Sequence, residues 1–238
     1  DDSWHFGMGI YAPVGGKSKF EDSFTGRYQA RKTEVTMVTF QPTISYKFND
    51  MLSVGVGPTI SYLEGTLSSN SLNPTSPGQQ DLLYTAKGDD TAVGANVGIL
   101  FQPYENTTFG LTYRSHTKFK LSGDAKLENT QTLGLPENTY KGKAKLDFTA
   151  PESIDFSFTH EFDDQWTLYA GAVWTRWSRL DKVSISDTVP NPANGMAPSI
   201  SPTEEVNFKD TWAYSIGGSY QVNPEWVLRA GFALDTSA

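Results

Sequence analysis

Cationic and titratable side chains occupy every second position of one short segment, as Arg114, His116 and Lys118. Because successive side chains of a β-strand point to opposite faces, this spacing predicts that the three share one face of a strand. A guanidinium or ammonium group in a pocket of low polarity binds a carboxylate through charge-assisted hydrogen bonds. The segment is therefore a candidate anion site, and the alternative is that each group is a solvated charge.

The remaining residues offer little for catalysis. His5, His116 and His160 fall on separate predicted strands, and the sequence contains no nucleophile motif. The chain has no cysteine, which removes thiolate metal sites and disulfide frameworks. We predict that the protein is not an enzyme and that it has no catalytic residues, no metal site and no cofactor.

Four short polar turns, each between apolar alternating runs, divide the chain into repeats. They are centred on Asn49-Asp50, Glu105-Asn106, Asp163-Asp164 and Asn223-Pro224. The spacing of these turns is roughly 55 to 60 residues. Asn and Asp favour tight turns because their side chains bond the nearby backbone. Each repeat holds a strand, a long polar segment and a returning strand, and this alternation of short and long connections is typical of a transmembrane β-barrel.

The predicted strands have one apolar face and one polar face. Within residues 53–62 the apolar positions are Val54, Val56, Pro58, Ile60 and Tyr62, and the residues between them are small or polar. One face is thus expected to contact lipid and the other to line the lumen. The same alternation places Arg114, His116 and Lys118 toward the lumen. A soluble β-propeller or lipocalin also alternates with period two, but two strands per repeat fit a propeller blade poorly.

Composition agrees with a membrane barrel. Aromatic residues make up 13% of the chain and hydrophobic residues 37%. Rings are expected in girdles at both membrane interfaces. No segment approaches the roughly 18 consecutive apolar residues of a membrane helix. The net charge of −8 argues against a nucleic-acid partner, which would need a basic surface.

An ordered set of motifs carries a resemblance to a known family. The motifs are Phe6-Gly7-Met8-Gly9-Ile10-Tyr11-Ala12-Pro13-Val14-Gly15, Leu52-Ser53-Val54-Gly55-Val56-Gly57, Gly110-Leu111-Thr112-Tyr113-Arg114-Ser115, Ala150-Pro151-Glu152-Ser153, Trp174-Thr175-Arg176-Trp177-Ser178 and Phe208-Lys209-Asp210-Thr211-Trp212. Over essentially its whole length the chain resembles the FadL/TodX-type outer-membrane transporters of long-chain fatty acids and aromatic hydrocarbons (OMPP1/FadL/TodX family).

The resemblance implies an all-β fold, a transmembrane antiparallel β-barrel of roughly 14 strands with an N-terminal hatch. The chain is similar to an internal fragment of it with about nine strands. Residues 1–238 are expected to form a single partial β-barrel domain. The hatch, the first two strands and the last three strands of the family are expected to lie outside it. The implied location is the outer membrane of a Gram-negative bacterium, and we expect a monomer.

The resemblance also implies a mechanism, in which a hydrophobic substrate leaves the lumen through an opening in the barrel wall. The strand kink that forms this opening corresponds by position to Pro13, Val14, Gly15 and Gly16. Proline removes a donor from the hydrogen-bond ladder, and glycine reaches backbone conformations that other residues avoid. The alternative is an ordinary loop that begins after the strand.

The long polar segments are expected to be extracellular loops that bind substrate. Residues 64–90 carry Leu67, Leu72, Leu82 and Leu83, and residues 124–140 carry Leu133 and Leu135. Apolar residues within a polar loop suggest a hydrophobic binding surface. The alternative is that the leucines only pack the loops on themselves.

The chain departs from the family's pattern at the carboxylate site. In the family, basic residues near two strand ends hold the fatty-acid carboxylate, and the matching positions here lie near Ser69 and Glu204, which are not basic. Arg114, His116 and Lys118 are the candidate replacements. The departure leaves uncharged hydrocarbons open as substrates.

A group of lysines gathers near one predicted loop: Lys118, Lys120, Lys126, Lys141, Lys143 and Lys145. The group suits either lipopolysaccharide phosphates or a merely solvated surface. Taken together, the residues predict passive transport of hydrophobic small molecules, with outer-membrane lipid and lipopolysaccharide as further partners. The alternative is a non-selective porin or a structural outer-membrane barrel.

Overall fold

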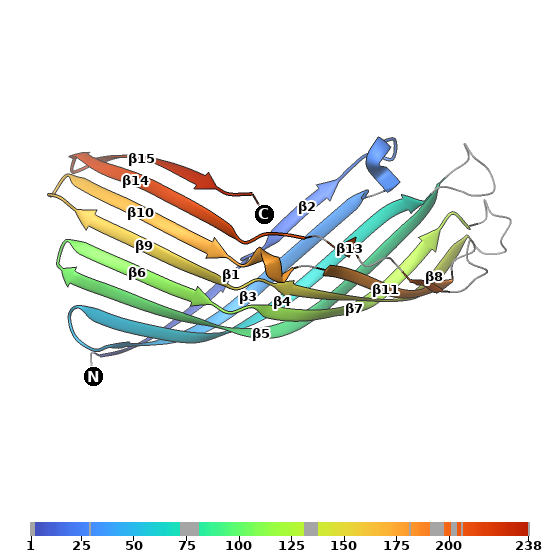
Figure 1. Ribbon diagram of the computed structural model, residues 1–238, viewed down its shortest axis with the longest axis horizontal. Coiled ribbons are helices and arrows are strands. Elements are labelled where there is room, and N and C mark those ends of the chain that lie inside the picture. The colour runs from blue at the N-terminus through green and yellow to red at the C-terminus, as the bar shows by residue number, and fades with distance from the viewer. Residues whose placement is uncertain are drawn as a thin grey trace.

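The computed structural model describes residues 3–28, 30–71, 81–130, 138–180, 182–190, 198–200, 204–205 and 207–237. Within these ranges the chain forms one continuous antiparallel β-structure and two short 3-10 helices (Figure 1). The strands are β1 (Trp4–Tyr11), β2 (Gly15–Lys19), β3 (Lys32–Lys47), β4 (Leu52–Ser71), β5 (Leu82–Tyr104), β6 (Thr107–Arg114), β7 (Thr117–Glu128), β8 (Thr139–Ala150), β9 (Ser153–Glu161), β10 (Trp166–Thr175), β11 (Lys182–Pro190), β12 (Pro198–Ile200), β13 (Glu204–Glu205), β14 (Thr211–Asn223) and β15 (Trp226–Asp235). The 3-10 helices are η1 (Thr25–Tyr28) and η3 (Trp177–Arg179). In this described part of the chain, no helix has the length and apolar character needed to cross a membrane.

The strands that form the wall follow one another along the chain. Their order is β1-β3-β4-β5-β6-β9-β10-β14-β15, and every neighbouring pair is antiparallel. These strands are the nine that the sequence predicted. The four predicted turns connect β3 to β4, β5 to β6, β9 to β10 and β14 to β15, all at one end of the sheet (Figure 1).

Three of these four turns are closed by the same side-chain hydrogen bonds. The carboxamide or carboxylate oxygen Oδ1 of Asn49, Asp163 and Asn223 accepts from the backbone N–H groups two and three residues further on. The donor–acceptor distances lie between 2.7 and 3.0 Å. Asn and Asp therefore occupy these positions because they replace backbone acceptors that the tight turn cannot supply.

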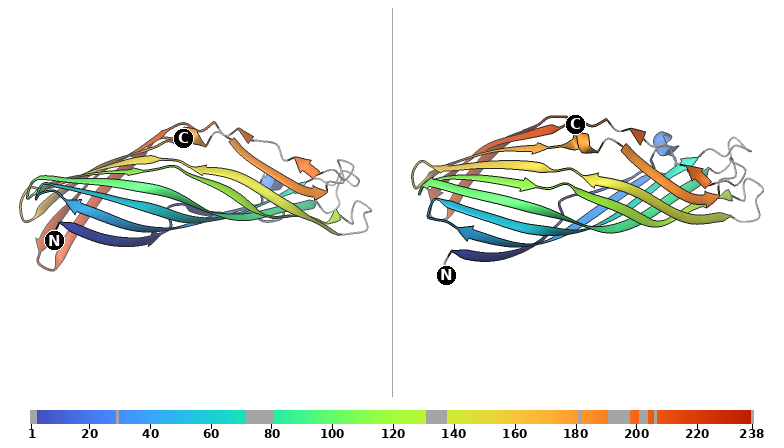
Figure 2. Two further views of the ribbon diagram at one scale, coloured as in Figure 1. Left: turned by 90° about the horizontal axis from the view of Figure 1, so that it is seen from below. Right: turned by 60° about the horizontal axis from the view of Figure 1, so that its bottom comes forward.

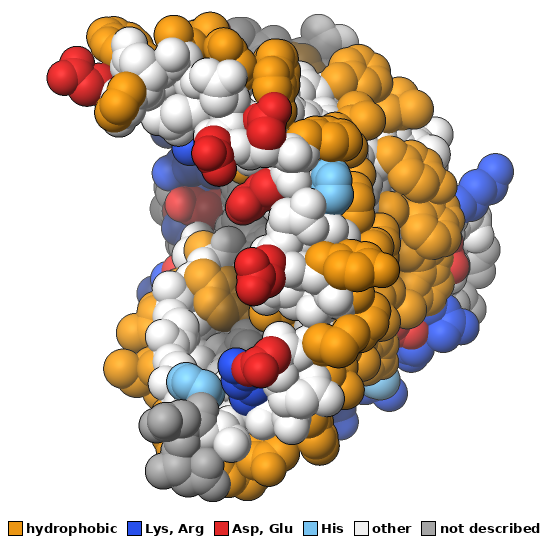
Figure 3. Space-filling view, turned by 90° about the vertical axis from the view of Figure 1, so that its left-hand side faces the viewer, with side chains coloured by type: hydrophobic (Ala, Val, Ile, Leu, Met, Phe, Trp, Pro, Cys, Tyr) orange, Lys and Arg blue, Asp and Glu red, His pale blue; other side chains and the backbone are white. Residues whose placement is uncertain are grey.

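The sheet curves into a trough with a concave inner face and a convex outer face (Figure 2). Viewed from the end with the short turns, the convex face is largely apolar (Figure 3). Phe6, Met8 and Ile10 are 72 to 79% exposed on it. Aromatic pairs mark the rim near the turns, with ring centroids 4.7 Å apart in Trp4–Tyr46 and 4.5 Å apart in Trp166–Tyr220. Such a surface is suited to lipid, with rings at the interface.

The prediction of long loops at the other end was wrong for much of their length. β4 and β5 remain paired up to Ser71 and Leu82, and β7, β8 and β11 extend the sheet beside them. The outward positions of these strands are mostly Lys, Ser, Thr, Asp or Glu, and many inward positions are Gly or Ala. In the far parts of β4 and β5 this alternation is too weakly apolar to be recognised as strand from sequence, whereas β7 alternates clearly through Phe119, Leu121 and Leu127.

The wall strand β6 does not continue smoothly into β7. Arg114 at the end of β6 pairs with Asn96 of β5, but Ser122 of β7 pairs with Asp89, so the register along β5 shifts by one residue. Because side chains alternate, a one-residue shift exchanges the two faces of the strand. Phe119 is consequently buried on the inner face at 1% exposure, and Lys118 is exposed on the outer face. The prediction that Lys118 faces the lumen with Arg114 was wrong for this reason.

Candidate functional site

The first wall strand is interrupted at Pro13. Tyr11 at the end of β1 pairs with Thr39, whereas Gly15 at the start of β2 pairs with Thr36. Three residues, Ala12 to Val14, thus lie opposite two residues of β3, which is the geometry of a β-bulge. The backbone N–H of Met37 donates to the carbonyl oxygen of Val14 at 3.1 Å. Since the shift exchanges the faces, Val14 packs against buried residues of the inner face.

The two glycines of the predicted kink lie beyond this interruption. Gly15 and Gly16 are the first residues of β2 and pair with β3 in regular register. Neither has a backbone φ in the left-handed region. The expectation that glycine supplies an unusual backbone conformation here was therefore wrong. Pro13, which lacks an N–H group, is the residue that suits the break.

A cavity of about 190 Å³ lies on the inner side of the interruption. Pro13 and Val14 form part of its lining, and most of the other lining side chains are apolar or carry hydroxyl groups, namely Tyr11, Met37, Thr39, Thr59, Ser61, Ser115, Thr117, Ala150, Pro151, Ser153, Thr175 and Trp177. Arg114 also lines the cavity and is the charged residue among those that do. The cavity therefore combines small volume, mixed apolar and hydroxyl walls, and one cation.

Of the three residues predicted as an anion site, the structure places one in the cavity. Arg114 has no ion pair with any residue in the described ranges. His116 lies between β6 and β7, is half-buried and does not line the cavity. Lys118 is on the opposite face of the sheet. The three residues are thus not brought together.

A polar cluster that sequence reasoning missed lies on the turn-proximal side of the cavity. Gln41 Oε1 accepts hydrogen bonds of 2.6 Å from both Tyr11 Oη and Asn96 Nδ2. The three residues come from β1, β3 and β5, and Asn96 pairs directly with Arg114. Asn96 is 7% exposed, and its Oδ1 atom has no partner among the described residues. The sequence carries no local signal for this cluster, because its three residues lie on separate strands.

The inner face of the extended strands is apolar over much of its length. One cluster contains Leu82, Ala86, Ala125, Leu127, Ala144 and Val189, with Tyr84 and Tyr140 beside it. A second cluster contains Met37, Leu63, Phe119, Leu121 and Ala150, and Val14 packs against it. Both clusters lie on the apolar inner surface of the sheet, the first near the far end of the strands and the second beside the interruption at Pro13.

The predicted substrate leucines separate into three groups. Leu82 belongs to the first cluster, and Leu67 pairs with Ala86 on the same inner face. Leu83 pairs with Glu128 and, as the next residue after Leu82, faces the other way. Leu72, Leu133 and Leu135 lie outside the described residues.

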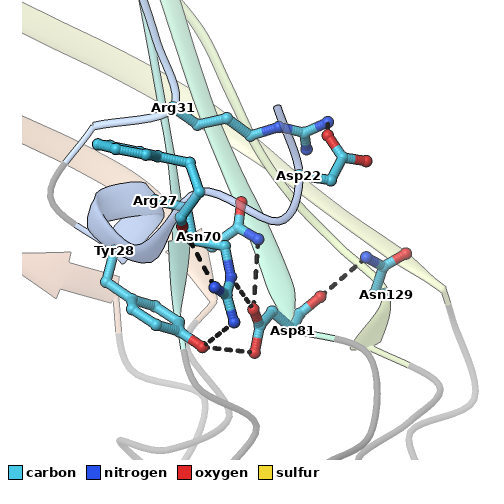
Figure 4. Close-up of polar contacts among 8 residues, drawn as sticks. Asp22, Arg27, Tyr28, Arg31, Asn70, Asp81 and Asn129 are labelled. Carbon is cyan, nitrogen blue, oxygen red and sulfur yellow. Dashed lines mark hydrogen bonds and ion pairs between the residues drawn. The ribbon is translucent and has the colours of Figure 1, made fainter. Parts of the chain in front are cut away.

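A clasp of polar side chains fastens helix η1 to the far ends of β4 and β5 (Figure 4). Arg27 Nε donates to Asp81 Oδ2 at 2.8 Å, and Tyr28 Oη donates to Asp81 Oδ1 at 3.3 Å. Asn70 Nδ2 and Asn129 Nδ2 donate to the side chain and the backbone carbonyl of Asp81. The hydrogen bond from Arg27 lowers the pKa of the Asp81 carboxyl. The clasp thus ties η1 to the far end of β4 and to the residues that flank β5 and β7.

A second ion-pair network lies on the other side of the cavity. Glu152, in the connection between β8 and β9, is 5% exposed. Its carboxylate accepts from Arg179 of η3 and, at 3.1 Å, from Nη1 of Arg176. The hydrogen bonds from Arg179 lower the pKa of Glu152 to about 2. The network joins two of the sequence motifs that carried the family resemblance.

Metal chemistry finds no support in the part of the chain that the structure describes. No group of three or more His, Asp or Glu residues there could hold a metal ion. The site thus consists of an apolar inner surface, a cavity with one arginine and an interrupted wall strand, an arrangement suited to binding and release.

A family model with the description "Outer membrane protein transport protein (OMPP1/FadL/TodX)" matches residues 1–238. The chain belongs to this family. Members of this family are described as outer-membrane and transport proteins and not as enzymes, and the predicted Gram-negative outer-membrane location is confirmed.

Relatives of the OMPP1/FadL/TodX family match the whole chain at low identity. The long-chain fatty acid transport protein of Escherichia coli K12 is 24% identical over 270 residues, which are 100% of this chain and 59% of the relative. Outer membrane protein P1 of Haemophilus influenzae is 23% identical over 266 residues, 55% of its length. The chain therefore spans little more than half the length of these relatives.

Solved structures of the OMPP1/FadL/TodX family share the fold. A Pseudomonas aeruginosa FadL homologue superimposes with a TM-score of 0.81 at 25% identity, covering 100% of this chain and 58% of the other. The Pseudomonas putida toluene transporter TodX gives a TM-score of 0.71 at 16% identity, covering 99% of this chain and 64% of the other. The predicted fold class, an all-β transmembrane antiparallel barrel, is confirmed.

Proposed function

We propose that the protein to which this chain belongs transports hydrophobic small molecules, long-chain fatty acids or related hydrocarbons, across the outer membrane through a lateral opening. The observation that carries the proposal is that the second apolar cluster borders the cavity behind Pro13, since Met37 and Ala150 belong to both and Val14 lines the cavity and packs against the cluster. Substrate enters at the far end of the extended strands, beside Leu82 and Leu127, and descends along the second apolar cluster. Transport is passive, because the route consists of binding surfaces and requires no energy source.

The wall interruption supports a sideways exit. The Ala12–Val14 bulge removes regular ladder pairing at the height of the cavity. Below it, Tyr11, Gln41 and Asn96 present a hydrogen-bonded polar surface that an apolar substrate does not favour. An apolar molecule in the cavity therefore has a more favourable path through the wall into lipid than toward the turn end of the lumen. The proposed partners of the protein are the substrate and outer-membrane lipid, including lipopolysaccharide. The protein acts as a monomer.

Arg114 supports a carboxylate substrate. It lines the cavity without an acidic partner in the described ranges, so its guanidinium is available for a charge-assisted hydrogen bond. The relatives point to both classes: one is named a long-chain fatty acid transport protein and another a toluene transporter. Aromatic hydrocarbons need only the apolar inner surface, whereas fatty acids would use that surface and Arg114.

The register shift suggests a direct test of the exit. Deleting Val14 from the full-length protein would place two residues opposite two and make β1 and β2 continuous with β3. We expect uptake of labelled oleate and of labelled toluene by cells to fall about tenfold or more. The matched control is Gly16→Ala, because a Cβ there would have no atom within 4 Å.

Undiminished uptake by a folded Val14 deletion would overturn the lateral exit. Folding is checked by the heat-dependent gel mobility of the barrel in outer-membrane fractions. Planar-bilayer recordings address the porin alternative. Large, steady ion conductance from the purified full-length protein would favour a water-filled pore over the proposed route.

A further inference from the structure

The outer face of the β7–β8 hairpin carries a concentration of positive charge. Lys118, Lys120 and Lys126 of β7 and Lys141, Lys143 and Lys145 of β8 lie on it, since the residues between them are turned inward. Blue side chains project from the convex side of the molecule beyond its apolar surface (Figure 3). This lysine face contrasts with a chain whose net charge is −8.

The orientation of the lysine face depends on the register shift between β6 and β7. Without the shift, Lys118 and Lys120 would share the inner face with Arg114. With it, Phe119 and Leu121 are buried inside at 1% and 4% exposure, and the lysines point outward. The fold therefore presents these cations to the surroundings of the barrel and keeps them out of the lumen.

Acidic neighbours neutralise only part of the lysine face. Lys126 pairs with Glu128 at 2.9 Å and Lys143 with Asp124 at 2.6 Å. Lys118, Lys120, Lys141 and Lys145 form no ion pair with the described residues. Exposed Asp147 lies opposite Lys120 in register without such a pair.

Two lysines of the β7–β8 hairpin repel each other and so lower its stability. Lys126 and Lys141 stand directly opposite each other in the β7–β8 ladder. Like charges in that arrangement are destabilising. An anion bound beside the two ammonium groups would relieve their repulsion.

The height of the lysine face identifies the anion. Tyr113, which is 43% exposed on the lipid-facing side of β6, is typical of the membrane interface, and Lys118 follows it by five positions. The lysines thus lie beyond this ring, on the side away from the short turns. We propose that the lysine face binds the phosphate groups of lipopolysaccharide, as lysines bind anionic headgroups elsewhere. The proposal rests on the proposed outer-membrane transport function and names its lipid partner.

The test measures binding of diphosphorylated lipid A to the purified full-length protein in detergent. In the variant Lys118→Gln/Lys120→Gln/Lys141→Gln/Lys145→Gln, we expect affinity to fall at least about tenfold, because each lysine near an anionic surface contributes to binding. The charge-conserving variant with Arg at the same four positions should retain it. Wild-type binding should also weaken as salt is raised.

Equal affinity of the Gln variant and the wild type would overturn the proposal. Two further results would overturn it: wild-type protein that binds fully dephosphorylated lipid A as tightly as diphosphorylated lipid A, or phosphatidylglycerol as tightly as lipid A. In either case the lysine face would not recognise the phosphates of lipopolysaccharide specifically. Heat-dependent gel mobility checks that both variants are folded. Because the assay contains no transported substrate, a failure of the lysine face to bind lipid A is distinguishable from a failure of transport in the uptake experiments.

Discussion

Glu152 accepts hydrogen bonds from both Nε and Nη2 of Arg179, so that the two carboxylate oxygens bind one edge of a single guanidinium. The two residues are 27 positions apart and come from the β8–β9 connection and from η3. The backbone joins the same elements, because the N–H of Arg176 donates to the carbonyl oxygen of Glu152 at 3.0 Å. This bidentate pair therefore fixes the end of β10 to the start of β9 beside the cavity.

Replacing Glu152 with Gln should destabilise the barrel. The substitution leaves two arginines without their anion, and breaking a buried ion pair from one side is costly. The lowering of the Glu152 pKa corresponds to about 3 kcal/mol of folding free energy. We expect the free energy of unfolding to fall by about 2 to 3 kcal/mol, because Arg176 is 48% exposed and solvent screens its part of the interaction. Urea titration of tryptophan fluorescence in the refolded full-length protein measures it. Glu225→Gln, in an exposed short turn, is the matched control and should change little.

The same pair predicts a pH dependence of stability. The pKa of Glu152 is lowered from 4.5 to about 2, so the folded state binds its proton more weakly than the unfolded state. Its contribution is fully present above pH 4.5 and is lost as the pH falls toward 2. The free energy of unfolding of wild type should therefore fall more steeply than that of Glu152→Gln across this window. Parallel curves for the two proteins would contradict the assignment.

Leu82 and Leu83 allow a matched test of the inner surface. Leu82 is 5% exposed in the first apolar cluster, whereas Leu83 faces the other way. Leu82→Ser should reduce uptake of oleate and toluene severalfold at low substrate concentration, because it places a hydroxyl group within the apolar cluster at the proposed entrance. Leu83→Ser should leave uptake close to that of wild type. Equal effects of the two variants would argue that the leucines serve folding alone.

Arg114→Gln separates the two substrate classes. Because a charge-assisted hydrogen bond contributes about 1.5 to 3 kcal/mol, oleate uptake at low concentration should fall about tenfold or more. Toluene uptake should stay unchanged, since it offers no carboxylate. The control is Arg229→Gln, another arginine of the wall, which does not line the cavity. A loss of toluene uptake equal to that of oleate would assign Arg114 a structural role.

The sequence predicted the wall well because its signals are local. Alternation through Val54, Val56 and Ile60 needs only neighbouring residues, and the turns at Asn49, Asp163 and Asn223 are closed by their own side chains. All nine predicted wall strands follow from these two signals. The far parts of β4 and β5 were missed because Gly65, Gly88 and their polar neighbours show no clear apolar alternation, whereas β7 alternates clearly but in the opposite phase to β6.

The candidate site was predicted only in part. Pro13 was identified because proline alters backbone pairing wherever it occurs. Lys118 was placed on the wrong face because alternation was carried through a break that the sequence does not display. The partnership of Glu152 with Arg179, and that of Gln41 with Tyr11 and Asn96, depend on contacts between strands far apart in the chain.

The sequence by itself determined the strand number of the wall, the end that carries the short turns and the face that meets lipid, because each depends on residues within one strand or turn. Only the tertiary structure decided where the faces exchange. The one-residue shifts near Pro13 and near Ser115 become visible when each strand is paired with its neighbour. A ladder register is a property of two strands, so one strand's sequence cannot fix it. These shifts turn Val14 and Phe119 inward and Lys118 outward, and so create both the apolar route and the lysine face.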